Sequence, residues 1–148
     1  MSSSEMAKAT QINLDTAQRV DIICRKGDTF SLRLTLTTSD TPPVAAFQDT
    51  DVFRLEVRET DTGELVQNAD GTDFFVQVEA SSSDETAGFI DLTVSAATMK
   101  TMPSGLYAYD VEQKVVNDSE GETLDTPTVA TLIYGTLKVN EDVSITAA

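Results

Sequence analysis

Oxygen-bearing side chains gather around a glycine near the middle of the chain, in the segment NADGTD. Asn68, Asp70 and Asp73 offer the amide and carboxylate oxygens that Ca²⁺ prefers as ligands. The segment lacks the spaced acidic ladder and the final glutamate of an EF-hand loop. Asn and Asp also stabilise tight turns by hydrogen-bonding their own backbone, with or without a metal. These three residues are therefore the metal-ligand candidates, and we expect a plain hairpin turn without a bound ion.

The residues that most often carry catalysis are scarce in this sequence. The 148-residue chain contains no histidine, so it has no Ser–His–Asp triad and no imidazole base or metal ligand. It also contains no G-x-S-x-G motif and no glycine-rich phosphate-binding loop. Pairs of carboxylates serve glycosidases, but with 25 acidic residues any such pair is easy to pick and uninformative. The sequence predicts neither an enzyme nor a cofactor site.

The single cysteine, Cys24, has no partner for a disulfide within the chain, which argues against a disulfide-stabilised secreted fold. It lies in the apolar segment RVDIICRKG and is expected to be a small core residue. The N-terminal residues MSSSEMAKATQ include no apolar stretch of signal-peptide length, and no later segment has about 18 consecutive apolar residues. We therefore expect synthesis in a cytoplasm and no membrane span.

The chain is strongly acidic, with 25 Asp and Glu against 10 Lys and Arg and a formal net charge of −15. Such a surface repels the phosphates of nucleic acids and of anionic membranes, so neither is an expected partner. Against this background Arg19, Arg25 and Lys26 form an unusual basic group. They either balance local charge at a turn or pair with acids of a neighbouring copy in a head-to-tail contact.

Alternation of apolar and polar side chains marks a series of strands separated by turns. The apolar faces expected to point inward include Phe30, Leu32, Leu34 and Leu36 of one segment, Phe53, Leu55 and Val57 of a second, and Ile90, Leu92 and Val94 of a third. The alternating segments are 19–24, 28–38, 52–59, 74–80, 89–94, 105–116 and 129–139, with a short final strand or tail over 140–148. Turns are indicated by Gly27-Asp28, by Gly63 and by the hairpin signal Asp70-Gly71. Gly135, inside the last long strand, indicates a bulge or a close approach of another backbone.

The segments between these strands predict loops and one connector helix. Pro42 and Pro43 predict a loop over 39–51, SSSDETAG predicts a flexible polar turn over 81–88, and NDSEGETLDTP predicts an exposed acidic loop over 117–127. A helix of about two turns is expected within 95–105, with Ser95 as its N-cap and Pro103 and Gly105 ending it.

Two tyrosines, Tyr107 and Tyr109, fall on the same side of one predicted strand. In one interpretation they occupy core positions, with each hydroxyl reaching a polar partner at the surface. In the other they make an aromatic contact with a neighbouring subunit, and they are retained as partner-contact candidates together with the basic group.

The strand signals together predict an all-β fold, namely an immunoglobulin-like antiparallel β-sandwich of about seven to eight strands. Residues 1–11, rich in Ser, Ala and Thr and without periodicity, predict an extended N-terminal arm, and residues 12–148 form the sandwich domain. Edge strands of such a domain present unpaired backbone groups, so a strand added by a neighbour is a natural mode of assembly.

Four short segments of the sequence resemble the N-terminal β-sandwich domain of upper-baseplate proteins of tailed bacteriophages. They are Gly27-Asp28-Thr29, residues 53–58 (FRLEVR), residues 103–110 (PSGLYAYD) and residues 135–143 (GTLKVNEDV), which follow in the same order. The match covers most of residues 12–146. The resemblance implies an immunoglobulin-like virion protein, and it carries over no catalytic or ligand-binding residue.

The function implied by this resemblance is that of a non-enzymatic structural component of a phage particle, made in the bacterial host cytoplasm. It is expected in many copies, as a capsid decoration protein or as a tail, baseplate or neck accessory that docks on other virion proteins. Upper-baseplate proteins continue into a helical stalk and receptor-binding modules, whereas this sequence ends at Ala148, which favours the head. The alternative is a calcium-binding or carbohydrate-binding β-sandwich module. The absence of tryptophan, a common sugar-stacking residue, argues against it.

Overall fold

The computed structural model describes residues 16–67 and 75–141, and in these ranges the chain is almost entirely β. Its strands are β1 (Gln18–Arg19), β2 (Ile22–Arg25), β3 (Phe30–Thr35), β4 (Val52–Glu59), β5 (Phe75–Glu79), β6 (Phe89–Val94), β7 (Gly105–Asn117) and β8 (Thr123–Asn140). Two short helices, α2 (Ser82–Ala87) and α3 (Ala96–Met99), connect β5 to β6 and β6 to β7. The predicted all-β class is confirmed.

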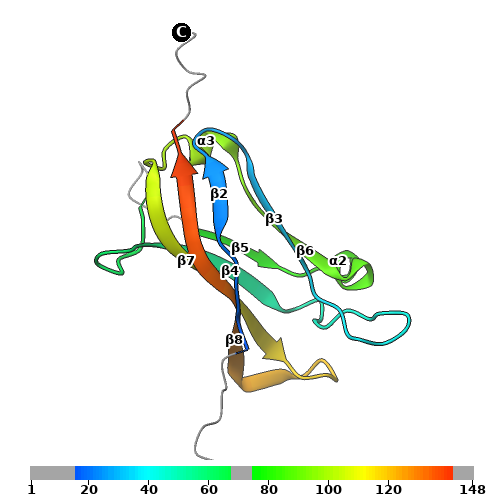
Figure 1. Ribbon diagram of the computed structural model, residues 1–148. Helices are drawn as coiled ribbons and strands as arrows, with labels where there is room; N and C mark the ends of the chain where they lie inside the picture. Colours follow the sequence, from blue (N-terminus) through cyan, green and yellow to red (C-terminus); the bar gives the residue numbers. More distant parts are fainter. Residues whose placement is uncertain (1–15, 68–74, 142–148) are drawn as a thin grey trace, which may run out of the picture.

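The strands form one large and one small sheet (Figure 1). The large sheet has the order β1-β8-β7-β4-β5, and β2 also pairs with β8, further along that strand. The small sheet consists of β3 and β6. The pairs β3–β6, β4–β5, β4–β7 and β7–β8 are antiparallel as predicted, but β1 and β2 run parallel to β8. The sequence missed this because alternation specifies which face a residue occupies and not the direction of the neighbouring strand.

The inward faces of the two sheets form one hydrophobic cluster. The predicted inward residues of three strands are among its most buried members, because alternate side chains of a strand point to the same face. The small sheet contributes Phe30, Leu34, Ile90, Leu92 and Val94, and the large sheet contributes Phe53, Leu55, Val57, Val111, Ile133, Leu137 and Val139. The loop before β4 adds Phe47, whose ring contacts Phe53 edge to face at 5.6 Å. Burial of these apolar side chains is the main source of stability.

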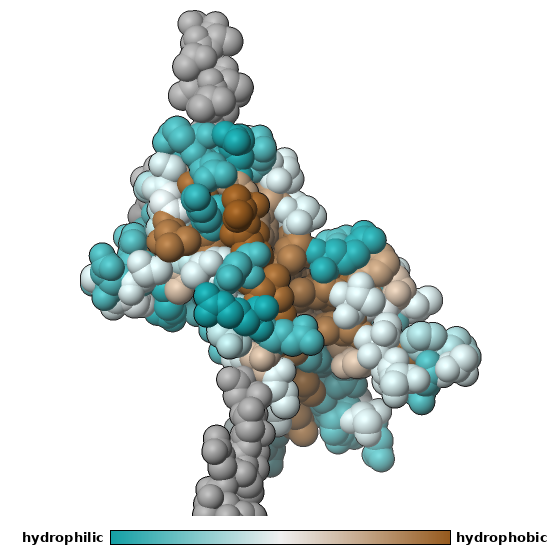
Figure 2. All heavy atoms as spheres, viewed as in Figure 1, coloured by the Kyte–Doolittle hydropathy of each residue, from teal (hydrophilic) through white to brown (hydrophobic). Residues whose placement is uncertain are grey.

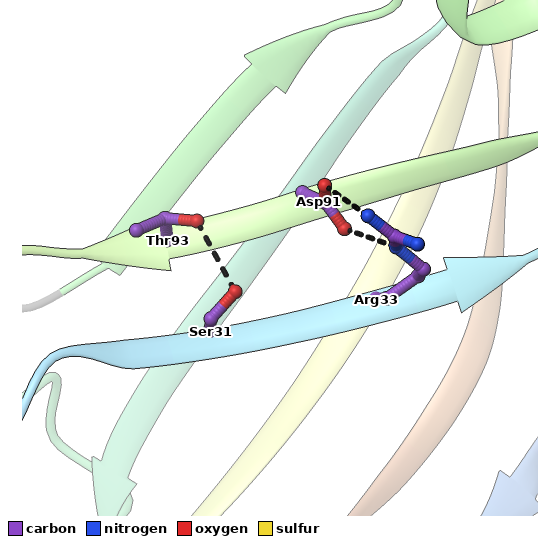
Figure 3. Close-up of polar contacts among 4 residues, drawn as sticks. All are labelled: Ser31, Arg33, Asp91 and Thr93. Atoms are coloured by element: carbon purple, nitrogen blue, oxygen red, sulfur yellow. Dashed lines mark hydrogen bonds and ion pairs between the residues drawn. The ribbon is translucent and has the colours of Figure 1, made fainter.

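The outer face of the small sheet carries cross-strand polar pairs instead (Figure 3). Arg33 on β3 binds Asp91 on β6 through two hydrogen bonds of 2.8 and 3.1 Å, and its guanidinium stacks on Phe89. Ser31 and Thr93 lie 3.5 Å apart between their hydroxyl oxygens in the next pair along. The Arg33 guanidinium holds the pKa of the Asp91 carboxyl below its usual value. These pairs fix the register of β3 against β6.

The prediction of a flexible polar turn at 81–88 is wrong, since this segment forms α2. Ser81 accepts a hydrogen bond from the backbone N–H of Asp84, and the Asp84 side chain accepts one from the N–H of Ser81, which makes a capping box. Gly88 ends the helix in the left-handed conformation, with φ of 82°. Both signals were present in SSSDETAG, but a helix that buries none of its residues has no apolar periodicity to detect.

The acidic loop predicted for 117–127 is shorter than expected, because β8 already begins at Thr123. Asp118 closes the turn by accepting hydrogen bonds from the backbone N–H groups of Glu120 and Glu122, each at 2.9 Å. This local capping lets the β7–β8 pairing run to the end of the hairpin. The connector helix α3 is likewise shorter than predicted, with four residues after the predicted N-cap Ser95.

Candidate partner-docking surface

The edge strands β1 and β2 are fixed to the large sheet by a close contact at Gly135. Val20, in the short gap between them, donates its N–H to the carbonyl of Tyr134 at 2.8 Å. Asp21 accepts a hydrogen bond from the backbone N–H of Thr136 at 3.0 Å, which lowers the pKa of its carboxyl. A Cβ at position 135 would lie 2.3 Å from the Val20 carbonyl oxygen, so glycine is required. The predicted close approach at Gly135 is confirmed.

An apolar groove opens between the two sheets beside this contact. It has a volume of about 490 Å³, with β3 as one wall, β1 and the residues beside it as the other, and part of β8 between them. Figure 2 shows the apolar surface that lies exposed between β3 and the β2–β8 edge. Its apolar lining includes Val20, Leu32, Leu34, Leu36, Leu132 and Ile133. Sequence reasoning placed the β3 leucines on an inward face, but only the arrangement of the sheets leaves that face partly uncovered.

The three basic candidates do not form a single site. Arg19 in β1 makes an ion pair with Asp21 (3.3 Å), and both side chains are more than half exposed. Arg25, at the end of β2, donates a hydrogen bond to the carbonyl of Glu141 at 2.6 Å, and Lys26 follows it in the turn. Arg25 follows Arg19 by six residue steps of largely extended chain, which places them roughly 20 Å apart. Arg25 and Lys26 therefore lie together, whereas Arg19 takes part in a local charge pair.

Both tyrosine candidates lie in the core, each only 4% exposed. The hydroxyl of Tyr107 donates to the carbonyl of Pro103 at 2.6 Å, and that of Tyr109 donates to the carbonyl of Val20 at 2.5 Å. Burial raises the pKa of both phenols, and the nearby Asp21 helps to raise that of Tyr109 to about 12. The structure thus matches the core interpretation, and neither ring presents a surface to a partner.

The metal-ligand candidates Asn68, Asp70 and Asp73 lie outside the described residues. Within 16–67 and 75–141, no group of three or more His, Cys, Asp or Glu is placed to hold a metal ion. Cys24 is half-buried and packs against the core as predicted. Burial, with a smaller contribution from Asp28, raises the pKa of its thiol, so the nucleophilic thiolate is disfavoured.

A buried polar cluster that sequence reasoning missed joins the loop before β4 to the β7–β8 hairpin. Asp51 is 1% exposed, and its Oδ2 accepts hydrogen bonds from Gln113 Nε2 (2.8 Å) and from the N–H of Gln48 (3.2 Å). Gln48 in turn donates through Nε2 to the carbonyl of Asn117 at 2.6 Å. The other Asp51 oxygen, Oδ1, has no hydrogen-bond partner among the described residues. The signal for this cluster in the sequence was Gln113, a polar residue at a position of β7 that alternation assigns to the apolar face.

The outer face of the large sheet carries an exposed apolar pair near the end of β8. Ile23 on β2 and Leu106 on β7 both stand opposite Lys138 on β8 in the strand register. Their side chains are 70% and 54% exposed, respectively. Two large exposed apolar side chains on neighbouring strands are the kind of apolar surface that contact sites are built from when it is contiguous.

No protein-family model matches this chain, and no curated protein is significantly similar to it in sequence. No helix within the described ranges is long and apolar enough to cross a membrane.

Proposed function

We propose that this chain is a non-enzymatic structural component of a bacteriophage particle, with an immunoglobulin-like sandwich as its fold. It acts in many copies, as a capsid decoration protein or as a tail, baseplate or neck accessory, and it docks on itself and on other virion proteins. The resemblance of four segments to upper-baseplate domains supports this proposal. Residues 53–58 fall on β4, residues 105–110 on β7 and residues 135–140 on β8, which are neighbours in the large sheet, and the fourth segment makes the turn before β3.

The observation that carries the proposal is the open construction of the molecule. In the part of the chain that the structure describes, β3 and β5 each pair with a neighbour on one side only. The apolar groove lies beside β3, and Ile23 and Leu106 are exposed on the large sheet. Unpaired strand edges next to apolar surface are suited to strand addition and to close packing against other subunits. These features support an assembly role better than a role in small-molecule chemistry.

Gold-labelled antibody electron microscopy of purified particles tests this function and the position of the chain. Label scattered over the head would identify a decoration protein. Label confined to the tail or its tip would identify a tail, baseplate or neck component. Particles that carry no label would overturn the virion proposal and leave a calcium-binding or carbohydrate-binding module as the function to test next.

Deletion of residues 1–11 provides a second test on the same particles. These residues lack the apolar periodicity of a core strand, so we expect the truncated chain to keep its fold and to be incorporated less well. Thermal unfolding of the purified chain checks the first part, and quantitative gel analysis of particles checks the second. A truncated chain that unfolds would show that the arm belongs to the folded domain.

A further inference from the structure

We propose that the apolar groove is the binding site for residues 10–15 of a second copy of this chain, which add as a strand to the free edge of β3. The inference deepens the self-association that is part of the proposed function, and it can be tested without knowledge of the particle.

The acceptor is the edge of β3 that faces the groove. Phe30–Thr35 pair with Phe89–Val94 along the other edge, and the described residues place no strand on the groove side. Beyond β3, the carbonyl of Leu36 accepts a hydrogen bond from the N–H of Ala46. The loop that follows β3 therefore occupies this edge from Leu36 onward. The edge that remains open spans six residues, which is the length of an average strand.

The donated segment has the pattern that such a groove requires. Residues 10–15 read TQINLD, with Ile12 and Leu14 two residues apart. In an extended strand these two side chains point to the same face, while Gln11 and Asn13 point to the other. Ile12 and Leu14 would therefore enter the apolar groove, and the polar side chains would remain in water.

The position of Thr16 favours a second copy as the donor. Thr16, Gln18 and Val20 already line the groove, so residues 12–14 of the same chain would have to reverse direction sharply to lie opposite them. Residues 1–26 contain no Gly, the residue that adopts the positive φ of tight reversals at least cost, although Asn13 and Asp15 also occur in turns. A strand that arrives from another copy needs no reversal.

The low net charge of residues 1–15 also favours a second copy as the donor. Residues 1–15 contain Glu5, Lys8 and Asp15, a net charge of −1, whereas the whole chain carries −15. The remaining residues therefore carry −14, that is, −15 minus −1. Two such bodies repel each other, and the nearly neutral N-terminal segment is the part that can approach a second copy at little electrostatic cost.

Cysteine cross-linking between two full-length variants tests this contact. In a Cys24→Ser background, chains with Ile12→Cys and a size tag are mixed with untagged chains with Leu32→Cys and oxidised. We expect a disulfide-linked heterodimer on a non-reducing gel. Ser31→Cys is the matched control, because Ser31 is the adjacent residue of β3 and lies on the exposed outer face. The control mixture should give no heterodimer above background.

The outcomes separate the possible occupants of the groove. A cross-link that forms only when Ile12→Cys and Leu32→Cys are in the same chain would overturn the inference, because residues 10–15 would then fold back onto their own chain. Equal cross-linking of Leu32→Cys and Ser31→Cys would also overturn it, as would no cross-linking of Leu32→Cys with either Ile12→Cys or Leu14→Cys. If cross-linking fails while particles still carry the antibody label, the virion function stands and only this contact is wrong.

Discussion

At the residue scale, Gly135 and Tyr109 hold residues 20 and 21 against the large sheet. The missing side chain of Gly135 lets the Val20 carbonyl approach, and the hydroxyl of Tyr109 donates to that same carbonyl. Val20 lines the groove, so a displacement of residues 20 and 21 would also change the candidate docking surface. Substitution of either residue should therefore change the free energy of unfolding, whatever the function of the chain.

We expect Gly135→Ala to lower the free energy of unfolding by about 1–3 kcal/mol or more, as overpacking does. The new Cβ would lie 2.3 Å from the Val20 carbonyl oxygen and 2.8 Å from Asp21 Oδ1, so the backbone would have to move. Urea denaturation measures the change. Gly121→Ala is the control, because position 121 has open space and only its φ of 85° opposes a side chain. Equal losses for the two variants would contradict the steric explanation.

Tyr109→Phe removes the hydrogen bond to Val20 and should cost about 1 kcal/mol at neutral pH. The variant also changes the response to alkali. Because the folded pKa of about 12 lies above the ordinary value of 10.0, the buried phenol contributes its full stabilisation below pH 10 and loses it as the pH rises towards 12. The free energy of unfolding should therefore fall less steeply over this range in the variant.

Urea denaturation at neutral pH and between pH 10 and 12 measures both effects. Tyr134→Phe is the matched control, since Tyr134 is 38% exposed in β8. The burial of Tyr107 also raises its pKa, so some alkaline loss should persist in Tyr109→Phe. An unchanged alkaline profile in Tyr109→Phe would contradict the assignment of Tyr109.

At the scale of elements, β3 and β6 depend on the short helix α2 that follows β5. Gly88, its C-cap, is buried against Thr37, and the Gly88 carbonyl accepts a hydrogen bond from the N–H of Leu36 at 3.0 Å. The helix itself buries no residue, so its caps hold it in place. Capping, more than packing, therefore positions the end of the small sheet that borders the groove.

We expect Ser81→Ala to destabilise the chain by about 0.5–2 kcal/mol, because it removes the N-cap acceptor of α2. The loss should be concentrated in α2, so amide hydrogen exchange should accelerate in residues 82–88 more than in β4 or β7. Ser83→Ala is the control, since Ser83 lies in the same helix and is exposed. If both variants exchange alike, the capping box contributes nothing measurable.

At the scale of the whole molecule, the charge of −15 opposes the compact state. Among the described residues the ion pairs Arg19–Asp21 and Arg33–Asp91 are exposed on both sides, and such pairs offset little of this repulsion. The same repulsion opposes contact between copies, so the contact proposed at the groove would have to be made by local apolar surface.

We expect the melting temperature to rise when NaCl is increased from about 0.01 M to about 0.15 M, since the screening length then falls from about 30 Å to about 8 Å. CaCl₂ and MgCl₂ at equal ionic strength should raise the melting temperature equally. A larger effect of Ca²⁺, lost in Asp70→Asn, would show that Asn68, Asp70 and Asp73 bind calcium. A melting temperature that does not respond to NaCl would contradict the role assigned to net charge.

The sequence alone determined the features that depend on local pattern. Alternation fixed the inward faces of β3, β4 and β6, and Gly135 signalled the close backbone approach. The capping residues Ser81 and Gly88 were also visible in the sequence, but the segment between them has no apolar periodicity, so a helix was not predicted there. Period-two alternation and turn chemistry act over a few residues, so they can be read without knowledge of the fold.

Only the tertiary structure decided how these elements meet. The parallel pairing of β1 and β2 with β8 joins residues more than a hundred positions apart, and no local signal specifies such a partner. The groove exists because the sheets separate beside β3, and Tyr109 is buried because Val20 crosses above Gly135. Long-range contacts set which apolar faces are covered and which stay open, since burial depends on the arrangement of both sheets.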